Sequence, residues 1–119
     1  MIRHGEEPYL ECSSLGERRL SAFFARPSQY GGKSIEAIYQ AAKVFEDGTT
    51  GLTWKQAKGR KAVNQDEVAA LYAHLWDVYI AEHSELLDLI RSHSGLQDTY
   101  GTPGHCCQAT ELWRIRNAR

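Results

Sequence analysis

Three residues of different chemistry recur at helical spacing in the middle of the chain. Glu36, Gln40 and Lys43 lie at positions i, i+4 and i+7, so on an α-helix a carboxylate, an amide and an amine share one face. Such a row can be a solvated polar face with a weak attraction between the acid and the base. It can also mount an acid/base group and a nucleophilic amine rigidly beside a pocket. The spacing by itself leaves both alternatives open.

A helix must carry this row, and the neighbouring residues predict one. Ile35 and Ile38 begin a series of apolar residues three and four positions apart, the spacing of a stripe that packs against a core. Ser34 precedes this stripe and can act as an N-cap, while Asp47–Gly48 is a natural stop. We therefore expect a helix over residues 34–46, with all three polar side chains mounted on it.

A strongly basic segment follows this helix. Four cationic side chains fall within seven residues, namely Lys55, Lys58, Arg60 and Lys61. The segment can be a solvated basic turn, or it can hold a phosphate or diphosphate, because a few charge-assisted hydrogen bonds suffice for such an anion. The sequence does not choose between these two interpretations.

The cysteines do not form a pattern that predicts a metal site or a disulfide framework. Cys12, Cys106 and Cys107 are odd in number, and two of them are adjacent. Together with His105 they could be assembled into a zinc site, but structural zinc ligands are usually separated by two or more residues and neighbouring side chains diverge. We expect reduced, mostly buried thiols, with neither a metal nor a cofactor.

The composition is that of a globular domain without a strong electrostatic field. The chain has 119 residues, of which 42% are apolar and 24% are charged, and its formal net charge is -1. This balance excludes a global field that recruits nucleic acid or an anionic membrane. The chain also lacks an apolar run of about 20 residues and an apolar leader, so we expect a cytoplasmic protein that does not bind a membrane.

The remaining pattern predicts one mainly helical domain. Residues 1–8 are polar and are expected to be a loose lead-in, so the domain covers residues 9–119. A small N-terminal β element, a hairpin of two short strands, is expected over residues 9–12 and 20–25. Helical spacing predicts about five helices, over residues 34–46, 53–58, 64–82, 84–94 and 107–116. The expected fold class is therefore mainly α, with a turn-rich stretch at residues 98–105 whose glycines let the backbone approach a ligand closely.

Several stretches resemble the NADAR superfamily, the YbiA-like proteins. Residues 20–23 resemble the small-aromatic start of that family, and residues 34–43 resemble its signature of a Glu followed by Tyr-Gln-Ala-x-Lys. Residues 57–60 resemble the segment that comes next in the family. Matching helices are expected at residues 76–78, 85–87 and 112–116. The late Trp-Gly-x-Gly and Gly-x-Asn-x-Leu-Gly stretch of the family is not recoverable in this chain.

The resemblance implies a YbiA-like helical domain that acts as an N-glycosidase on an ADP-ribosyl or nucleotide-type N-riboside. Breaking such a bond develops positive charge at ribose C1′, which a carboxylate stabilises, while an amine can attack C1′ and form a Schiff base with the opened sugar. The catalytic residues that the resemblance implies are Glu36 and Lys43. The residues that it implies for substrate binding are Arg19, Phe23, Tyr39, Gln40, Lys58, Arg60 and His105. Of these, the basic side chains would hold a phosphate or diphosphate.

The sequence is also compatible with two other functions. The missing late motif favours a non-catalytic binder that sequesters an ADP-ribose-like nucleotide. Alternatively, the chain is a structural or interaction domain in which Glu36 and Lys43 are surface residues. For the enzyme and for the binder, the expected partner is a small-molecule nucleotide or an ADP-ribosylated nucleobase, with nucleic acid only as the modified substrate.

Overall fold

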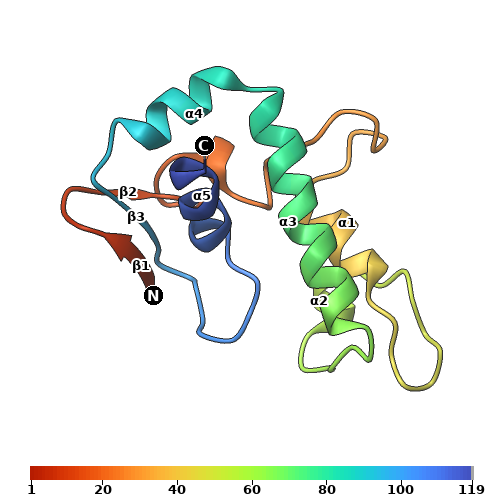
Figure 1. Cartoon of the computed structure of the whole chain (residues 1–119). Helices are drawn as coiled ribbons and strands as arrows, with labels where there is room; N and C mark the ends of the chain where they lie inside the picture. The colour runs from red at the N-terminus through yellow and green to blue at the C-terminus, as the bar shows by residue number, and fades with distance from the viewer. Residues whose placement is uncertain (119) are drawn as a thin grey trace.

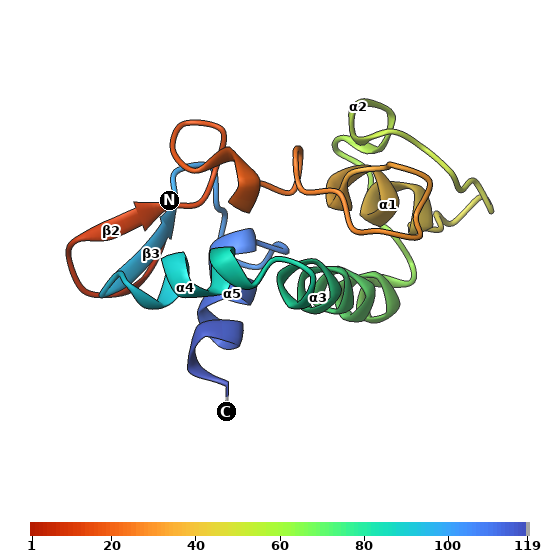
Figure 2. The same cartoon turned by 90° about the horizontal axis from the view of Figure 1, so that it is seen from above.

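Two short strands at the start of the chain and one more than 80 residues later form one mixed sheet, which lies at one end of the molecule (Figure 1). The computed structural model describes residues 1–118. Its elements, in chain order, are β1 (Ile2–Gly5), β2 (Tyr9–Glu11), the 3-10 turn η1 (Arg18–Leu20), α1 (Ile35–Ala42), α2 (Trp54–Ala57), α3 (Gln65–Ala81), α4 (Ser84–Arg91), β3 (Gly95–Asp98) and α5 (Gln108–Asn117). Figure 2 shows α1 and α2 at the end opposite to the sheet.

The central strand β3 organises the sheet. It pairs antiparallel with β1, with Ile2 opposite Asp98, and parallel with β2, with Tyr9 opposite Gly95. The strand begins on a glycine because the neighbouring chain passes very close, and a Cβ atom at Gly95 would lie 2.4 Å from the carbonyl oxygen of Glu6. Helix α5 packs against β1 and β3, so the sheet is covered on that side.

The expected fold class is wrong. The described chain is an α/β domain with five α-helices and a three-stranded mixed sheet, rather than a mainly α fold with a small N-terminal β element. Residues 2–5 form β1 instead of a loose lead-in. The expected partner of the strand at residues 9–12 was the segment 20–25, but that segment turns and bonds to α1 instead. The amide groups of Ile35 and Glu36 donate to the carbonyl oxygens of Ala25 and Ala22, at 2.9 and 3.0 Å.

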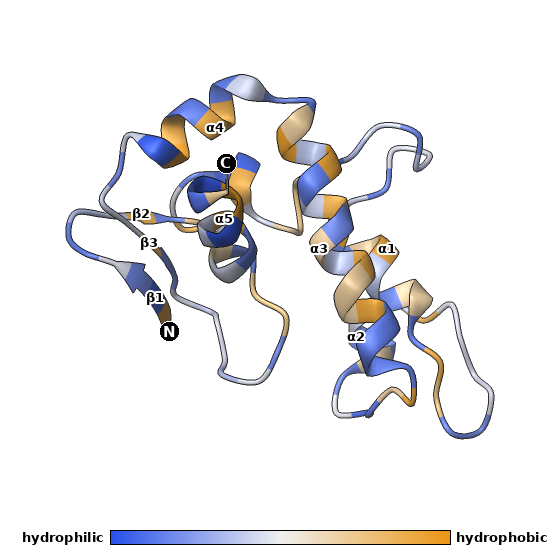
Figure 3. Ribbon diagram, viewed as in Figure 1, coloured by the Kyte–Doolittle hydropathy of each residue, from blue (hydrophilic) through white to orange (hydrophobic). Residues whose placement is uncertain are grey.

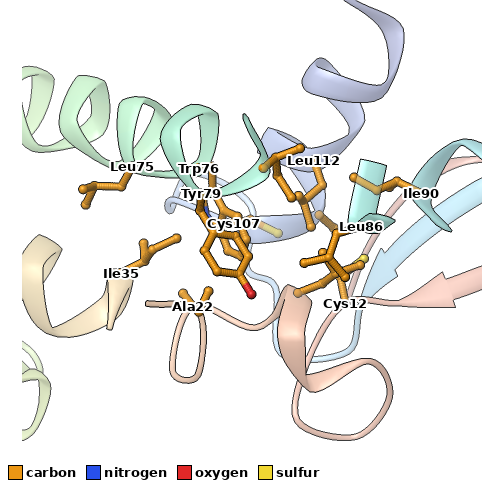
Figure 4. Packing of buried hydrophobic residues seen from close by; sticks show 14 of the residues in the cluster. Cys12, Ala22, Ile35, Leu75, Trp76, Tyr79, Leu86, Ile90, Cys107 and Leu112 are labelled. Atoms are coloured by element: carbon orange, nitrogen blue, oxygen red, sulfur yellow. The ribbon is translucent and has the colours of Figure 1, made fainter. Parts of the chain in front are cut away.

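Helix α3 is the main core element. Its fully buried Trp76 and Leu75 share one apolar cluster with Ile35 of α1 and Leu86 of α4 (Figure 4). Apolar and polar residues alternate along α4 (Figure 3), and its buried face carries Leu86 and Ile90. The helix predicted over residues 64–82 is confirmed as α3. Within residues 1–118, none of the helices is both long enough and apolar enough to cross a membrane.

Helix α1 is shorter than expected, because two side chains replace its last backbone bonds. The Asn64 side chain donates to the carbonyl oxygen of Ala42 and accepts from the amide of Val44, at 3.0 and 2.9 Å. The Thr50 hydroxyl also donates to the carbonyl oxygen of Lys43, at 3.0 Å. Lys43 thus has an extended backbone just beyond the helix and does not continue the row that begins at Glu36.

The position of β3 in the core predicts a large difference between two leucines. We expect Leu96→Ala to lower the free energy of unfolding by about 2–5 kcal/mol, since Leu96 is fully buried on the central strand and its loss leaves a cavity. Leu15→Ala is the matched control, because this side chain is 64% exposed; its effect should stay within about 0.5 kcal/mol. Urea denaturation measures both. Equal effects would contradict the central position of β3.

Candidate functional site

A cavity of about 600 Å³ lies between the part of the molecule that contains the sheet and the part that contains α1. Its walls come from the segment after β2, from α1 and α3, and from the turn between β3 and α5. The lining residues are Ser13, Ser14, Ser21, Phe23, Phe24, Glu36, Tyr72, Asp98, Tyr100, Gly101, Thr102, His105, Cys106 and Gln108. This volume suits a small ligand, and the mixture of carboxylates, hydroxyls and aromatic rings suits one that has both a sugar and a planar ring. We call it the acidic cavity.

Glu36 enters the acidic cavity from the first turn of α1. The Ser34 hydroxyl begins this helix by accepting from the amide of Ala37, at 3.1 Å. The Gln40 side chain, one turn further along, donates to Glu36 Oε1 at 2.8 Å. Burial raises the pKa of Glu36, while the bond from Gln40 and the charge of Lys43 act in the opposite direction. The carboxyl group is thus suited to exchanging a proton.

A second carboxylate, that of Asp98, lines the same cavity and is 4% exposed. Its Oδ1 accepts from the amide of Tyr100 at 2.9 Å, and its Oδ2 accepts from Gln108 Nε2 at 2.9 Å. The Cys107 thiol donates to Oδ2 at 3.5 Å. Burial raises the pKa of Asp98, whereas the bonds from Tyr100 and Cys107 lower it. The cavity therefore holds two carboxyl groups with different surroundings.

Aromatic side chains surround the mouth of the acidic cavity. Phe23 and Phe24 are 48% and 47% exposed, and Tyr100 is 63% exposed. Trp54 of α2 lies edge-on to Phe23, with 5.8 Å between the ring centroids. Exposed rings at the mouth of a polar cavity offer a planar ligand a stacking surface.

A second cavity, of about 640 Å³, lies between the end of α1, residues 59–62 and the first turns of α3, and its lining has three Lys or Arg side chains and one carboxylate, that of Asp66. Lys43, Arg60, Lys61 and His105 line it, and we call it the basic cavity. The Lys43 ammonium lies 4.7 Å from the centre of the Tyr39 ring. His105 and Cys106 line both cavities, so the two adjoin there.

An aromatic pair also lies between the cavities. Tyr39 lines the basic cavity and Tyr72 lines the acidic cavity, and their rings meet edge-on at 5.1 Å. Burial, together with a hydrogen bond to Cys106, raises the pKa of Tyr39. This hydroxyl therefore stays protonated near neutral pH, so the wall between the cavities is neutral at this position.

The residues expected at the site fall into three groups. Glu36, Phe23 and His105 meet in the acidic cavity, and Gln40 reaches it through its bond to Glu36. The basic cavity brings together Tyr39, Lys43, Arg60 and His105. Two expected phosphate ligands line neither cavity. Arg19 is paired with Glu17 at 2.6 Å on the surface, and Lys58 is exposed at the end of α2.

The sequence patterns did not single out Asp98, Gln108 or Lys61 as individual site residues. Asp98 opens the turn-rich stretch that was expected to approach a ligand, and this was the available signal. Gln108 begins a helix and has no sequence signature, because its importance comes from the partners it meets in the fold. Among residues 1–118, no group of three or more His, Cys, Asp or Glu side chains is placed to hold a metal ion.

The raised pKa of Glu36 predicts a pH-dependent effect on stability. The ordinary value is 4.5, and the folded state holds the proton to a higher pH than the unfolded chain does. Wild-type protein therefore loses stability as the pH rises from 4.5 through the raised pKa. Glu36→Gln removes this titration, so the variant should be the more stable protein at pH 7 and should lose that advantage below pH 4.5.

Urea denaturation at a series of pH values measures this effect. Glu46→Gln, at an exposed position after α1, controls for the loss of one negative charge. A difference between Glu36→Gln and wild type that stays constant across the pH series would contradict the prediction.

Comparisons of the chain with protein-family models, with curated proteins and with solved structures find no match. The likeness to the NADAR superfamily remains a prediction from the sequence. The chemistry of the two cavities must therefore be argued from their own residues.

Proposed function

We propose that the chain is an N-glycosidase of the NADAR type, which cleaves the bond between C1′ of a ribose and the nitrogen of a nucleobase or nucleotide. One observation carries this proposal. Glu36 has a half-buried carboxyl group in a ligand-sized cavity, and Lys43 lines the adjoining cavity, where its charge acts to lower the pKa of Glu36. A proton carrier and a nucleophile of this kind are what cleavage of an N-riboside by way of a Schiff base requires.

In the proposed reaction, the nitrogen lone pair of Lys43 attacks C1′ while the C1′–N bond breaks, and the electron pair of that bond leaves with the nitrogen base. Glu36 gives a proton to the departing nitrogen and takes one from the attacking amine, so the proton count balances. The sugar ring then opens to a Schiff base, which water hydrolyses to the free sugar, with its phosphate groups still attached, and the Lys43 amine. The His105–Cys106 junction is where the amine and the carboxyl group would reach the same ligand.

The rest of the substrate is assigned from the charges and rings around this point. The exposed rings of Phe23, Phe24 and Tyr100 favour a planar base at the mouth of the acidic cavity. Lys61 and Arg60 of the basic cavity favour phosphate groups on the other side, where a phosphate would compete with Asp47 for the Arg60 guanidinium, which it meets at 3.2 Å. A nucleotide-type riboside, including an ADP-ribosyl group, has both features.

The test is mass analysis of products after incubation with NAD, ADP-ribose and ADP-ribosylated guanosine. We expect a split N-glycosidic bond with wild-type protein, and a rate at least about 10²-fold lower in Glu36→Gln and in Lys43→Ala. Lys58→Ala is the matched control for Lys43→Ala, because Lys58 lines neither cavity, and its rate should match wild type. Reduction with borohydride should trap the sugar on wild-type protein and not on Lys43→Ala.

Other outcomes would replace the proposal. Full activity in both site variants would exclude their catalytic roles. A ligand that binds and is released chemically unchanged would identify a sequestering protein. The absence of both turnover and binding would leave an interaction domain.

A further inference from the structure

The proposed reaction makes no use of Asp98, the second buried carboxylate of the acidic cavity. We propose that Asp98 is the fixed negative charge of this cavity, which stabilises the positive charge that develops on the ribose, and that Gln108 is the residue that positions it. This inference rests on the proposed function for the nature of the ligand. The observations behind it concern hydrogen bonds and burial, and they do not depend on turnover.

The two carboxyl groups differ in the number of hydrogen-bond donors around them. Within the described residues, Asp98 accepts from the Tyr100 amide, from Gln108 Nε2 and from the Cys107 thiol. Glu36 accepts from one side chain, that of Gln40. Burial raises the pKa of both carboxyl groups, and the hydrogen-bond donors around Asp98 oppose that rise by stabilising its ionised form. On this difference in donors we assign the lasting charge to Asp98 and the proton exchange to Glu36. Two carboxyl groups of one site thereby take different roles.

Gln108 is placed to hold Asp98 still. Its side chain is buried, and Nε2 donates both to Asp98 Oδ2 and to the carbonyl oxygen of Cys12, at 2.9 Å each. Its Oε1 accepts from the amide of Ala22 at 3.2 Å. Every polar group of this amide therefore has a partner, and the orientation of the amide is determined by three different segments.

The same bonds also link the two carboxyl groups. The peptide of Ala22 donates to Gln108 Oε1, and its carbonyl oxygen accepts from the backbone amide of Glu36 at 3.0 Å. A single residue thus connects the side chain that holds Asp98 with the first turn that holds Glu36. A ribose between the two carboxylates would meet them at a defined separation, which is the condition for electrostatic stabilisation without reorganisation.

The first test compares the binding of two ligands that are not substrates, a cationic imino analogue of ribose and its neutral ether analogue. Calorimetry on wild-type protein should show at least about 10-fold tighter binding of the cation, since a buried carboxylate attracts it. Asp98→Asn should abolish this preference. Gln108→Leu should reduce it while leaving the affinity for the neutral analogue within about 3-fold.

Gln97→Leu is the matched control. Gln97 lies on β3 beside Asp98, and its side chain donates to Glu11 Oε1 at 3.0 Å. This variant therefore also loses an amide–carboxylate bond, but one that lies outside the acidic cavity. Its preference for the cation should equal that of wild type. A preference that survives in Asp98→Asn, or a wild-type protein that shows none, would overturn the proposal.

A second measurement uses wild-type protein, so its result does not depend on whether a variant folds. Carbon NMR of the side-chain carboxyl groups should show Asp98 titrating at a lower pH than Glu36, and the reverse order would overturn the assignment. The groups that act on Asp98 besides its hydrogen-bond donors are Glu11 and the N-terminal amine, and both can be followed in the same titration. In Gln108→Leu, the titration of Asp98 should move to higher pH.

The outcomes separate this inference from the proposed function. If no product forms but the preference for the cation disappears in Asp98→Asn, the N-glycosidase proposal fails and this assignment stands. If turnover depends on Glu36 and Lys43 while Asp98→Asn keeps both its rate and its preference for the cation, the assignment fails and the proposed function stands.

Discussion

The hydrogen bonds of the Gln108 side chain are the constraint on which the rest of this site depends. One buried amide joins the end of β2 at Cys12, the end of β3 at Asp98 and the turn at Ala22. A buried amide with unpaired polar groups lowers the free energy of unfolding. The folded state is therefore stable only when all three segments bond to this amide. Because the turn at Ala22 also bonds to the first turn of α1, the position of Glu36 follows from the same amide.

The carboxylate of Glu36 and the amine of Lys43 line different cavities because α1 is short and ends before Lys43. Glu36 and Gln40 lie on the helix and serve the acidic cavity, whereas Lys43 lies just beyond it and lines the basic cavity. If the helix continued through Lys43, amine and carboxylate would form one surface row. The side chains of Asn64 and Thr50 prevent this by occupying backbone groups at the helix end. In the proposed reaction, C1′ of the ribose would lie at the His105–Cys106 junction, where the two cavities adjoin.

Local patterns predicted the helices well, because a helix is formed by residues three and four positions apart. The apolar spacing of α3 and α5 and the Ser34 cap of α1 were all visible in the sequence. The sheet was not predictable in this way. Strand β3 has four residues, and both of its partners lie more than 80 positions earlier in the chain, so no local pattern reports the pairing. The segment 20–25 has the composition of a strand, but its carbonyl oxygens accept from the free amides at the start of α1 instead.

The sequence by itself determined the helical elements and the neighbouring placement of Glu36 and Gln40, since residues four apart on a helix necessarily meet. It also identified the basic segment that supplies Arg60 and Lys61 to one cavity. Only the tertiary structure decided that Asp98 and Gln108 line the acidic cavity and that Arg19 and Lys58 line neither cavity. The physical reason is that burial and hydrogen bonding between distant segments select the members of a cavity, and neither is encoded in the spacing of residues along the chain.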